Sequence, residues 1–358
     1  MAGDKFDELP EQVGSTRTVS VVYFGTTLRV SPSSEIKGAI VTTGTIGVAA
    51  MGGDATTVLA RIQNLERRNI PAAWLTTGGA GLDALSLFAA AAATTDRILL
   101  GTCITPTWPR HPIVTAQQVQ VVANLAPGRF RLGLGPSHRP AMKQMFGVDF
   151  KTPLTNLREY VKIVKTLLSE GSIEFDGEHY HAHAQIPKPV ENVPVMASAL
   201  RTGSYEFCGA EADGAISWVS PYTYLKDVAL PAMQTGAQRV NRKPPPLIAH
   251  VPLSVCDNRG QVRNEARKQL SVYPRLPFYA RMFAQAGFPE AGESATWSDR
   301  MVDAVVLSGN EEEVGVRLLE LFGWGIGEVI VHIITVGDDQ QASWDRALDL
   351  LAGLVTPN

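Results

Sequence analysis

Residues 46–65 read IGVAAMGGDATTVLARIQNL, a short apolar run followed by a longer segment with a different spacing. The run at 46–51 has the length and composition of a buried strand. In the segment after it, Val58, Leu59, Ile62 and Leu65 recur at helical intervals, and Asp54 stands at the expected N-cap. A strand followed by a helix is the repeating unit of parallel α/β folds, so this stretch predicts one βα unit.

The same alternation continues along the chain. Eight runs predict strands, at 46–51, 72–76, 98–104, 130–134, 193–197, 215–219, 247–255 and 329–334. Helical spacing returns between them, as at Leu157, Val161, Val164 and Leu168, and Asp83 is a second candidate N-cap. Eight strand–helix pairs favour a closed (β/α)8 TIM barrel over a doubly wound sheet. We therefore predict an α/β fold of this type, with insertions at the rim.

Two stretches interrupt this rhythm. Residues 171–189 are typical of a rim hairpin with a turn at Asp176-Gly177. Residues 271–298, rich in Pro, Gly and aromatic residues, are too long for an ordinary connection and are interpreted as a lid-like insertion. We expect a flexible N-terminal tail at 1–15 and a single barrel domain at 16–358, in which the β-like residues of 18–45 fall outside the repeat.

Composition restricts the classes of function. Hydrophobic residues make up 45% of the 358 residues, charged residues 19%, and the formal net charge is -3. This charge offers no basic field for nucleic acid or for an anionic membrane surface. The longest apolar stretch, at 85–93, is far shorter than a membrane span. Three widely spaced cysteines, Cys103, Cys208 and Cys256, do not form a disulfide framework and favour a reducing, cytoplasmic compartment.

The active site of a (β/α)8 barrel lies at the carboxyl ends of its strands. After the third predicted strand comes a proline-rich loop that contains Trp108, and after the fourth come Gly135, Pro136, Ser137 and His138. Small residues there let a ligand approach the backbone. His138 is the candidate catalytic residue, because it is a titratable side chain at a predicted strand end.

The segment after the fifth strand predicts the start of a helix at Arg201, Thr202, Gly203 and Ser204. Backbone N–H groups and hydroxyls at a helix N-terminus bind anions, and Arg201 would add positive charge, so a phosphate is one interpretation. Capping of the helix by Thr202 or Ser204 explains the same residues equally well.

Several segments together resemble the luciferase-like flavin- and F420-dependent oxidoreductases over residues 45–354. The most specific are ILLGT at 98–102 leading to RHP at 110–112, PGRFRLGLG at 127–135 and GAEADG at 209–214. GPSH at 135–138, LREY at 157–160 and FDGE at 175–178 are closer to the actinobacterial F420-dependent branch than to the FMN monooxygenases.

The resemblance implies roles for particular residues. Thr105 and Pro106 would carry a backbone bulge beneath the tricyclic ring, and the segment 201–204 would hold the cofactor phosphate. The predicted cofactor-binding residues are Thr76, Thr77, Thr105, Pro106, Thr107, Gly135, Pro136, Ser137, His138, Ala197, Ser198, Arg201, Thr202, Gly203 and Ser204. The predicted substrate-pocket residues are Met51, Trp108 and Trp218.

The chain departs from the family pattern at two places. Relatives usually have a Gly-Pro pair where this chain has Arg201-Thr202, which weakens the assignment of the phosphate. Relatives also often place an acidic residue and a histidine after the second strand, where this chain has TTGG at 76–79. The usual acid/base pair is therefore missing, and the catalytic assignment stays open.

The remaining histidines allow two interpretations each. His179, His181 and His183 alternate along one face of the hairpin, which suits zinc, but solvated surface histidines are favoured and no metal site is predicted. His250 and His332 lie inside apolar strands and are interpreted as hydrogen-bonded barrel residues rather than catalysts.

The predicted function is hydride transfer between coenzyme F420 and a small organic, secondary-metabolite or peptide-derived substrate. Two alternatives are an FMN-dependent monooxygenase and a catalytically silent flavin-binding barrel. A hydrolase built on the hairpin histidines is the least favoured. A homodimer is a further expectation of the resemblance.

Overall fold

The computed structural model describes residues 20–23, 26–29 and 44–355. The chain divides into two units, 1–40 and 41–358. In the first, β1 (Ser20–Tyr23) pairs antiparallel with β2 (Thr26–Arg29). This hairpin occupies part of the segment that the sequence left outside the barrel repeat, and the predicted tail at 1–15 lies outside the described residues.

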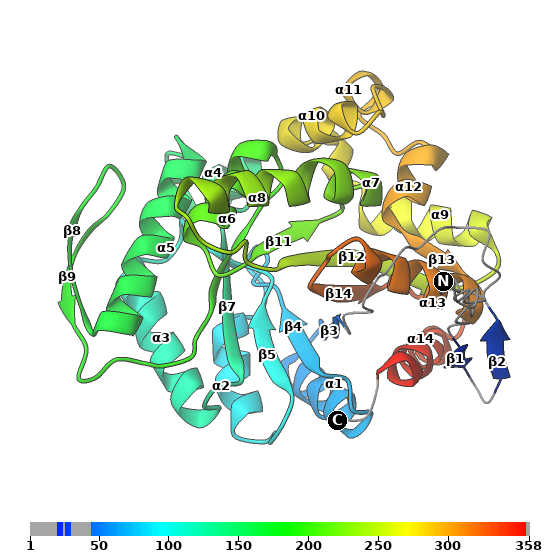
Figure 1. Cartoon of the computed structure of the whole chain (residues 1–358), viewed down its shortest axis with the longest axis horizontal. Helices are drawn as coiled ribbons and strands as arrows, with labels where there is room; N and C mark the ends of the chain where they lie inside the picture. The colour runs from blue at the N-terminus through cyan, green and yellow to red at the C-terminus, as the bar shows by residue number, and fades with distance from the viewer. Residues whose placement is uncertain (1–19, 24–25, 30–43, 356–358) are drawn as a thin grey trace, which may run out of the picture. The chain divides into compact units, whose positions relative to one another are not determined.

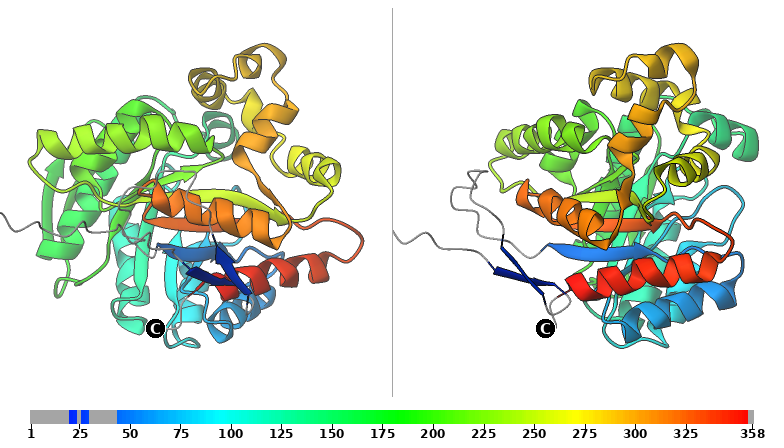
Figure 2. Two further views of the ribbon diagram at one scale, coloured as in Figure 1. Left: turned by 45° about the vertical axis from the view of Figure 1, so that its right-hand side comes forward. Right: turned by 90° about the vertical axis from the view of Figure 1, so that its right-hand side faces the viewer.

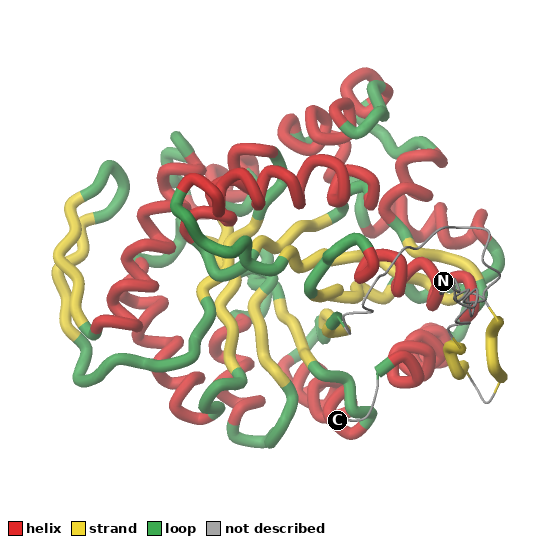
Figure 3. Tube along the Cα trace, viewed as in Figure 1, coloured by secondary structure: helices red, strands yellow, loops and turns green. Residues whose placement is uncertain are grey.

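Eight parallel strands form a closed barrel in the second unit, which confirms the predicted fold (Figure 1, Figure 3). They are β3 (Thr45–Ala49), β4 (Ala72–Leu75), β5 (Leu99–Thr102), β7 (Phe130–Gly135), β10 (Val195–Ser198), β11 (Ala215–Trp218), β12 (Leu247–Val255) and β14 (Glu328–Ile333). Neighbours pair in this order, and β14 pairs with β3 to close the ring. Each strand overlaps one of the eight predicted runs.

Helices pack on the outside of the barrel (Figure 3). They are α1 (Ala55–Arg67), α2 (Ala84–Ala92), α3 (Pro112–Leu125), α4 (Arg139–Phe146), α5 (Pro153–Glu170), α6 (Thr202–Glu211), α7 (Tyr222–Tyr224), η1 (Leu225–Ala229), α8 (Leu230–Arg239), α9 (Arg259–Gln269), α12 (Asp299–Val305), α13 (Glu311–Gly323) and α14 (Gln340–Leu354). The predicted caps are confirmed, because Asp54 accepts from Thr57 N at 2.9 Å and Asp83 accepts from Ser86 N at 2.9 Å.

Two additions leave the barrel wall. The predicted hairpin is present as β8 (Ser172–Asp176) and β9 (His181–Gln185), which stand off beyond α5 in Figure 1. Its turn is closed by a hydrogen bond from Gly177 N to Tyr180 O of 2.9 Å. The predicted insertion contains η2 (Tyr273–Arg275), α10 (Pro277–Gln285) and α11 (Glu290–Ser294), which project from one end of the barrel in both views of Figure 2.

Two short strands extend the sheet at the carboxyl ends. The strand β6 (Thr105–Pro106) pairs with β7 after the chain has passed the cis peptide bond between Cys103 and Ile104. The strand β13 (Leu307–Gly309) pairs with the end of β12. Both extensions therefore lie on the side of the barrel where the site is expected.

One large side chain fills the interior near the amino ends of the strands. Trp74 is fully buried, and a Cβ atom at either Gly47 or Gly101 would lie 2.5 Å from its ring atoms. Its Nε1 donates to Glu328 at 2.9 Å, Arg131 forms an ion pair with Glu328, and the Arg131 guanidinium lies 4.4 Å from the Trp74 ring centre. We call Trp74, Arg131 and Glu328 the floor cluster.

Candidate active site at the barrel mouth

Strand register decides which side chains enter the barrel mouth. Trp218 of β11 pairs with His250 of β12, and His250 pairs with Ile330 of β14. Ile330 belongs to the hydrophobic cluster inside the barrel. Since side chains alternate along a strand, Trp218, His250 and His332 all face inward. Trp218 and His332 lie at the carboxyl ends of their strands, and the register places His250, in the middle of β12, beside Trp218.

These inward-facing rings form a continuous group with residues from two loops. The mouth cluster consists of His138, Trp218, His250, Tyr273, Tyr279 and His332. The Trp218 ring centre lies 4.1 Å from that of His250 and 5.4 Å from that of His332. The two histidine ring centres are 6.1 Å apart.

The insertion at 271–298 supplies the two tyrosines of this cluster. Tyr273 lies 5.9 Å from Trp218, and Tyr279 lies 4.9 Å from Tyr273, between ring centres. His138, which follows β7, packs against both tyrosines at 5.9 and 5.8 Å. The insertion therefore lies against the mouth, where a lid is expected, and movement of this lid stays a prediction.

Burial keeps the three mouth histidines uncharged at neutral pH. Desolvation lowers the pKa of His332 to about 4 and the pKa of His138 below its usual value. Desolvation, together with repulsion from His332, holds the pKa of His250 well below its usual value. Neutral imidazoles next to a Trp ring form an uncharged wall that can still exchange hydrogen bonds.

The two strand histidines differ in their hydrogen bonds. His332 Nε2 lies 3.4 Å from Gln269 Oε1, which agrees with the interpretation of a hydrogen-bonded barrel residue. In the described part of the chain, the buried His250 Nε2 has no partner, so that interpretation does not fit His250. A buried polar atom without a partner costs stability.

The opposite side of the mouth contains a glycine, Gly135 of β7, that packs closely against its neighbours. In the ring of eight strands, β5 and β7 lie four strands away from β12 and β14, and therefore across the opening. A Cβ at Gly135 would lie 2.5 Å from Ser198 Oγ, so only glycine fits there. Thr76 Oγ1 donates to Cys103 O at 2.6 Å and fixes the chain where it leaves β5. Ser198 and Ile104 fill the space beside the Gly135 backbone, so this edge of the mouth is closely packed.

The N-terminus of α6 offers unpaired donors next to this edge. Ser204 Oγ accepts from Leu200 N and Arg201 N at 3.0 and 3.1 Å and so ties the turn before the helix, whose N-cap residue is Arg201. The described residues provide no acceptor for the N–H groups of Thr202 and Gly203. Arg201, Thr202 and Gly203 are exposed, which suits an anion.

Residues 36–328 match the sequence model of the luciferase-like monooxygenases. The chain belongs to this family. The resemblance found in the sequence is thereby confirmed at the level of the family.

Particular relatives refine the placement within the luciferase-like family. The F420-dependent glucose-6-phosphate dehydrogenase of Intrasporangium calvum is 28% identical over 298 residues, which cover 78% of this chain and 87% of that protein. That of Segniliparus rotundus is 32% identical over 177 residues, 47% of this chain and 52% of the relative. The chain thus spans about half the length of several curated relatives that it matches.

A solved luciferase-like barrel has the same fold. An F420-dependent secondary alcohol dehydrogenase, in complex with an F420–acetone adduct, superposes with a TM-score of 0.72 at 16% identity. The superposition covers 88% of this chain and 100% of the other. At this identity the comparison supports the fold alone.

Some residues expected in a luciferase-like site lie away from the mouth cluster. Thr107 is fully buried, and its Oγ1 donates to Asn156 Oδ1 at 2.7 Å. Trp108 packs against Phe150 and His179, with ring centres 5.0 and 5.4 Å apart. Ala197 is fully buried between the inward-facing residues of β10, so its side chain faces the helices. This packing does not support a contact of Trp108 or Ala197 with a ligand.

Other predicted residues lie at or near the strand ends. Thr77 accepts from Ala84 N at 3.0 Å, and Met51 is exposed after β3. Thr105 and Pro106 are buried in β6, and the Thr105 Oγ1 has no partner in the described part of the chain. Pro136 and Ser137 are half-buried after β7. The roles of these residues as ligands stay predictions.

The hairpin histidines pair with neighbouring carboxylates. His181 Nδ1 lies 2.8 Å from Asp176 Oδ1, and His183 contacts both Asp176 and Glu174. Among residues 20–23, 26–29 and 44–355, no three His, Cys, Asp or Glu side chains are grouped so that they could hold a metal ion. None of the described helices has both the length and the apolarity that a membrane span requires.

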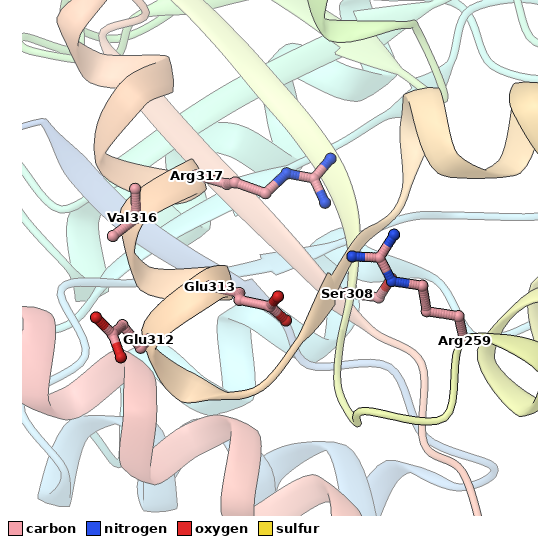
Figure 4. Close-up of a pocket in the computed structure, with 6 residues that line it drawn as sticks. All are labelled: Arg259, Ser308, Glu312, Glu313, Val316 and Arg317. Atoms are coloured by element: carbon pink, nitrogen blue, oxygen red, sulfur yellow. The ribbon is translucent and has the colours of Figure 1, made fainter. Parts of the chain in front are cut away.

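A separate hollow of about 350 Å³ lies among α9, β13 and α13 (Figure 4). Its lining consists of Arg259, Ser308, Glu312, Glu313, Val316 and Arg317. It shares no residue with the mouth cluster. Its side chains carry both signs of charge, so we place the chemistry at the mouth and not in this hollow.

Proposed function

We propose that this chain is an F420-dependent oxidoreductase that moves a hydride between the deazaflavin and a small organic substrate. The names of the matching relatives support this choice. The observation that carries the proposal is the pair of N–H groups at Thr202 and Gly203 that have no acceptor among the described residues, at the start of the helix that follows β10, the neighbour of β7.

The residues at the mouth fit such a cofactor. Thr202, Gly203 and Arg201 would hold its phosphate, since free N–H donors and a cation favour an anion at a helix N-terminus. The edge at Gly135 and Ile104 would support the ring. When bound, the cofactor would supply or accept the hydride. The tyrosines of the insertion would cover the substrate and exclude water from it.

The first experiment is a titration of the purified apo-protein with F420 and, separately, with FMN, followed by tryptophan fluorescence. Trp218 lies in the mouth cluster, so a ligand there should quench its emission. Binding of F420 in preference to FMN supports the proposal. Preference for FMN would move the assignment to a monooxygenase, and binding of F420 without hydride transfer to any acceptor would leave a silent flavin-binding barrel.

A matched pair of variants tests the phosphate site. Gly203 and Gly260 are both the second residue of their helices, α6 and α9. A side chain at Gly203 has room, because the nearest heavy atom lies 4.0 Å from the Cβ position. Gly203→Asp should weaken F420 binding about tenfold or more, since its carboxylate takes the place of the phosphate. Gly260→Asp should leave the affinity unchanged, and equal effects of the two variants would contradict the site.

Two further proposals concern the environment of the protein. We infer a cytoplasmic location from the three free thiols at Cys103, Cys208 and Cys256. A homodimer stays a proposal that rests on the family resemblance, and light scattering at working concentration tests it.

A further inference from the structure

The luciferase-like pattern does not supply this chain with a residue for one chemical role, that of proton donor or acceptor. Where the resemblance implies an acidic residue and a histidine, the chain has Thr76 and Thr77, whose hydroxyls already bond to Cys103 O and Ala84 N. A threonine hydroxyl does not exchange protons readily near neutral pH. Hydride transfer to or from an oxygen-bearing carbon also needs a proton acceptor or donor.

His250 has the properties that this role requires. It lies on β12, which is separated from β7 and its Gly135 edge, proposed to hold the ring, by β10 and β11. Its side chain is nine-tenths or more buried, and its Nε2 is without a partner in the described part of the chain. The neighbouring His332 is different, because its Nε2 faces Gln269. A substrate between the ring edge and β12 would therefore meet His250 Nε2.

The surroundings of His250 indicate the kind of substrate. The Trp218 ring packs against it at a tilt of 44°, with ring centres 4.1 Å apart, and the Tyr273 ring centre lies 5.9 Å from that of Trp218. The titratable groups of the mouth cluster are His138, Tyr273, Tyr279 and His332, and burial favours the uncharged form of each. The rings themselves are uncharged at neutral pH, and the arginines that follow His138 and Tyr273 in the sequence, Arg139 and Arg275, are exposed. It suits a substrate with an apolar body and one neutral oxygen, rather than a phosphorylated sugar.

We propose that His250 Nε2 accepts the hydroxyl proton when the site oxidises an apolar secondary alcohol, and returns it when the site reduces the ketone. In the oxidation the carbinol C–H bond breaks and its hydrogen leaves with both electrons to the oxidised deazaflavin. The O–H bond breaks, its proton joins His250 Nε2, and the carbonyl double bond forms. The imidazolium then loses the proton to water. This inference rests on the proposed function.

The main test compares His250→Gln with His181→Gln in the F420-loaded protein. Glutamine keeps a polar group near the position of Nε2 but cannot take a proton, and His181 is an exposed hairpin residue. With cyclohexanol and a panel of aliphatic and aryl secondary alcohols, kcat of His250→Gln should fall about 100-fold or more. The F420 affinity should stay within about twofold of wild type, and His181→Gln should match wild type in both. His250→Asn should show the same loss if the glutamine variant does not fold.

The pH profile separates proton transfer from a structural role. In the wild type, kcat for oxidation should fall at acid pH as His250 becomes charged, and this limb should be absent from the residual activity of His250→Gln. A glutamine variant that retained the limb, or retained kcat within about threefold, would overturn the inference.

A second readout does not depend on turnover. With histidine labelled by ¹⁵N, the His250 signal is assigned by its loss in His250→Gln. Adding cyclohexanol to the complex with reduced F420, which cannot accept a hydride, should shift this signal. An unmoved signal contradicts the inference. A wild type that binds no F420 would overturn the proposed function as well, whereas F420 binding without turnover of any alcohol in the panel would overturn only the role of His250.

Discussion

The floor and the mouth of the barrel both contain buried polar groups next to a tryptophan, but the hydrogen bonding of these groups differs. At the floor, Glu328 accepts from Trp74 and pairs with Arg131, whose guanidinium also covers the indole ring. At the mouth, His250 packs against Trp218 and leaves its Nε2 without a partner in the described part of the chain.

The difference separates groups that stabilise the fold from groups that await a ligand. At the floor both oxygens of Glu328 are paired, although Arg131 Nε, like His250 Nε2, has no partner among the described residues. Paired buried charges rigidify a core, whereas an unpaired polar atom costs stability. Pairing of the polar atoms, rather than depth of burial, should therefore determine which substitutions unfold the protein and which ones remove activity.

The largest effect on stability is expected at the floor. Glu328→Ala leaves Arg131 as an unpaired charge in the barrel and removes the acceptor of Trp74, which should cost about 3 to 5 kcal/mol of unfolding free energy. Urea unfolding measures this loss. The control is the double variant Arg131→Met with Glu328→Leu, in which no charge is left unpaired. A double variant as unstable as the single one would show that the floor does not depend on charge pairing.

Acid should destabilise the protein through the mouth. The pKa of His332 is about 4 in the fold against an ordinary value of 6.5, so the unfolded chain binds more protons between these values. Stability should accordingly fall as the pH is lowered from 6.5 to 4, by about 3 kcal/mol for a shift of this size. Thermal unfolding at several pH values measures the slope. His332→Asn should flatten it, and an unchanged slope would rule out this histidine as the cause.

The glycines around Trp74 provide a smaller test of the floor. Gly101→Ala places a Cβ 2.5 Å from the Trp74 ring, whereas Gly53 has no heavy atom within 4 Å of the corresponding position. Overpacking of a filled core costs about 1 to 3 kcal/mol, so Gly101→Ala should lower the unfolding midpoint. Gly53→Ala should leave it near that of wild type, and equal midpoints would mean that the interior is less tightly filled.

The smallest effect concerns a polar group near the mouth that is fully paired. Asp83 accepts from Ser86 N at 2.9 Å and pairs with Arg110 at 2.6 Å. Asp83→Ala removes both contacts and should cost about 1 kcal/mol of unfolding free energy. Asp83→Asn keeps the cap and removes the charge, so its unfolding midpoint should lie between those of wild type and Asp83→Ala.

The sequence predicted the barrel well because its signals are local. Strands buried on both faces appear as short apolar runs, and the caps at Asp54 and Asp83 lie directly before their helices. The candidate site was less predictable. His250 and His332 lie within apolar runs and resemble packing residues, and only the pairing of Trp218 with His250 places them at the mouth.

The tyrosines of the insertion were not predictable for a different reason. Tyr273 and Tyr279 belong to a segment outside the βα repeat, so no periodicity indicates which of its side chains turn toward the barrel. Their contacts with His138 and Trp218 arise from tertiary packing. The position of the insertion after the seventh strand predicted a segment that covers the mouth, but it did not predict which side chains make the contacts.

The space around Trp74 also has a consequence for how this barrel can change over evolutionary time. The Trp74 indole on β4 fills the space that side chains of the two neighbouring strands would occupy, and those strands have Gly47 and Gly101 at these positions. None of these three positions can be exchanged alone without a clash or a void. Homologous barrels should therefore replace them together, as a covarying triplet.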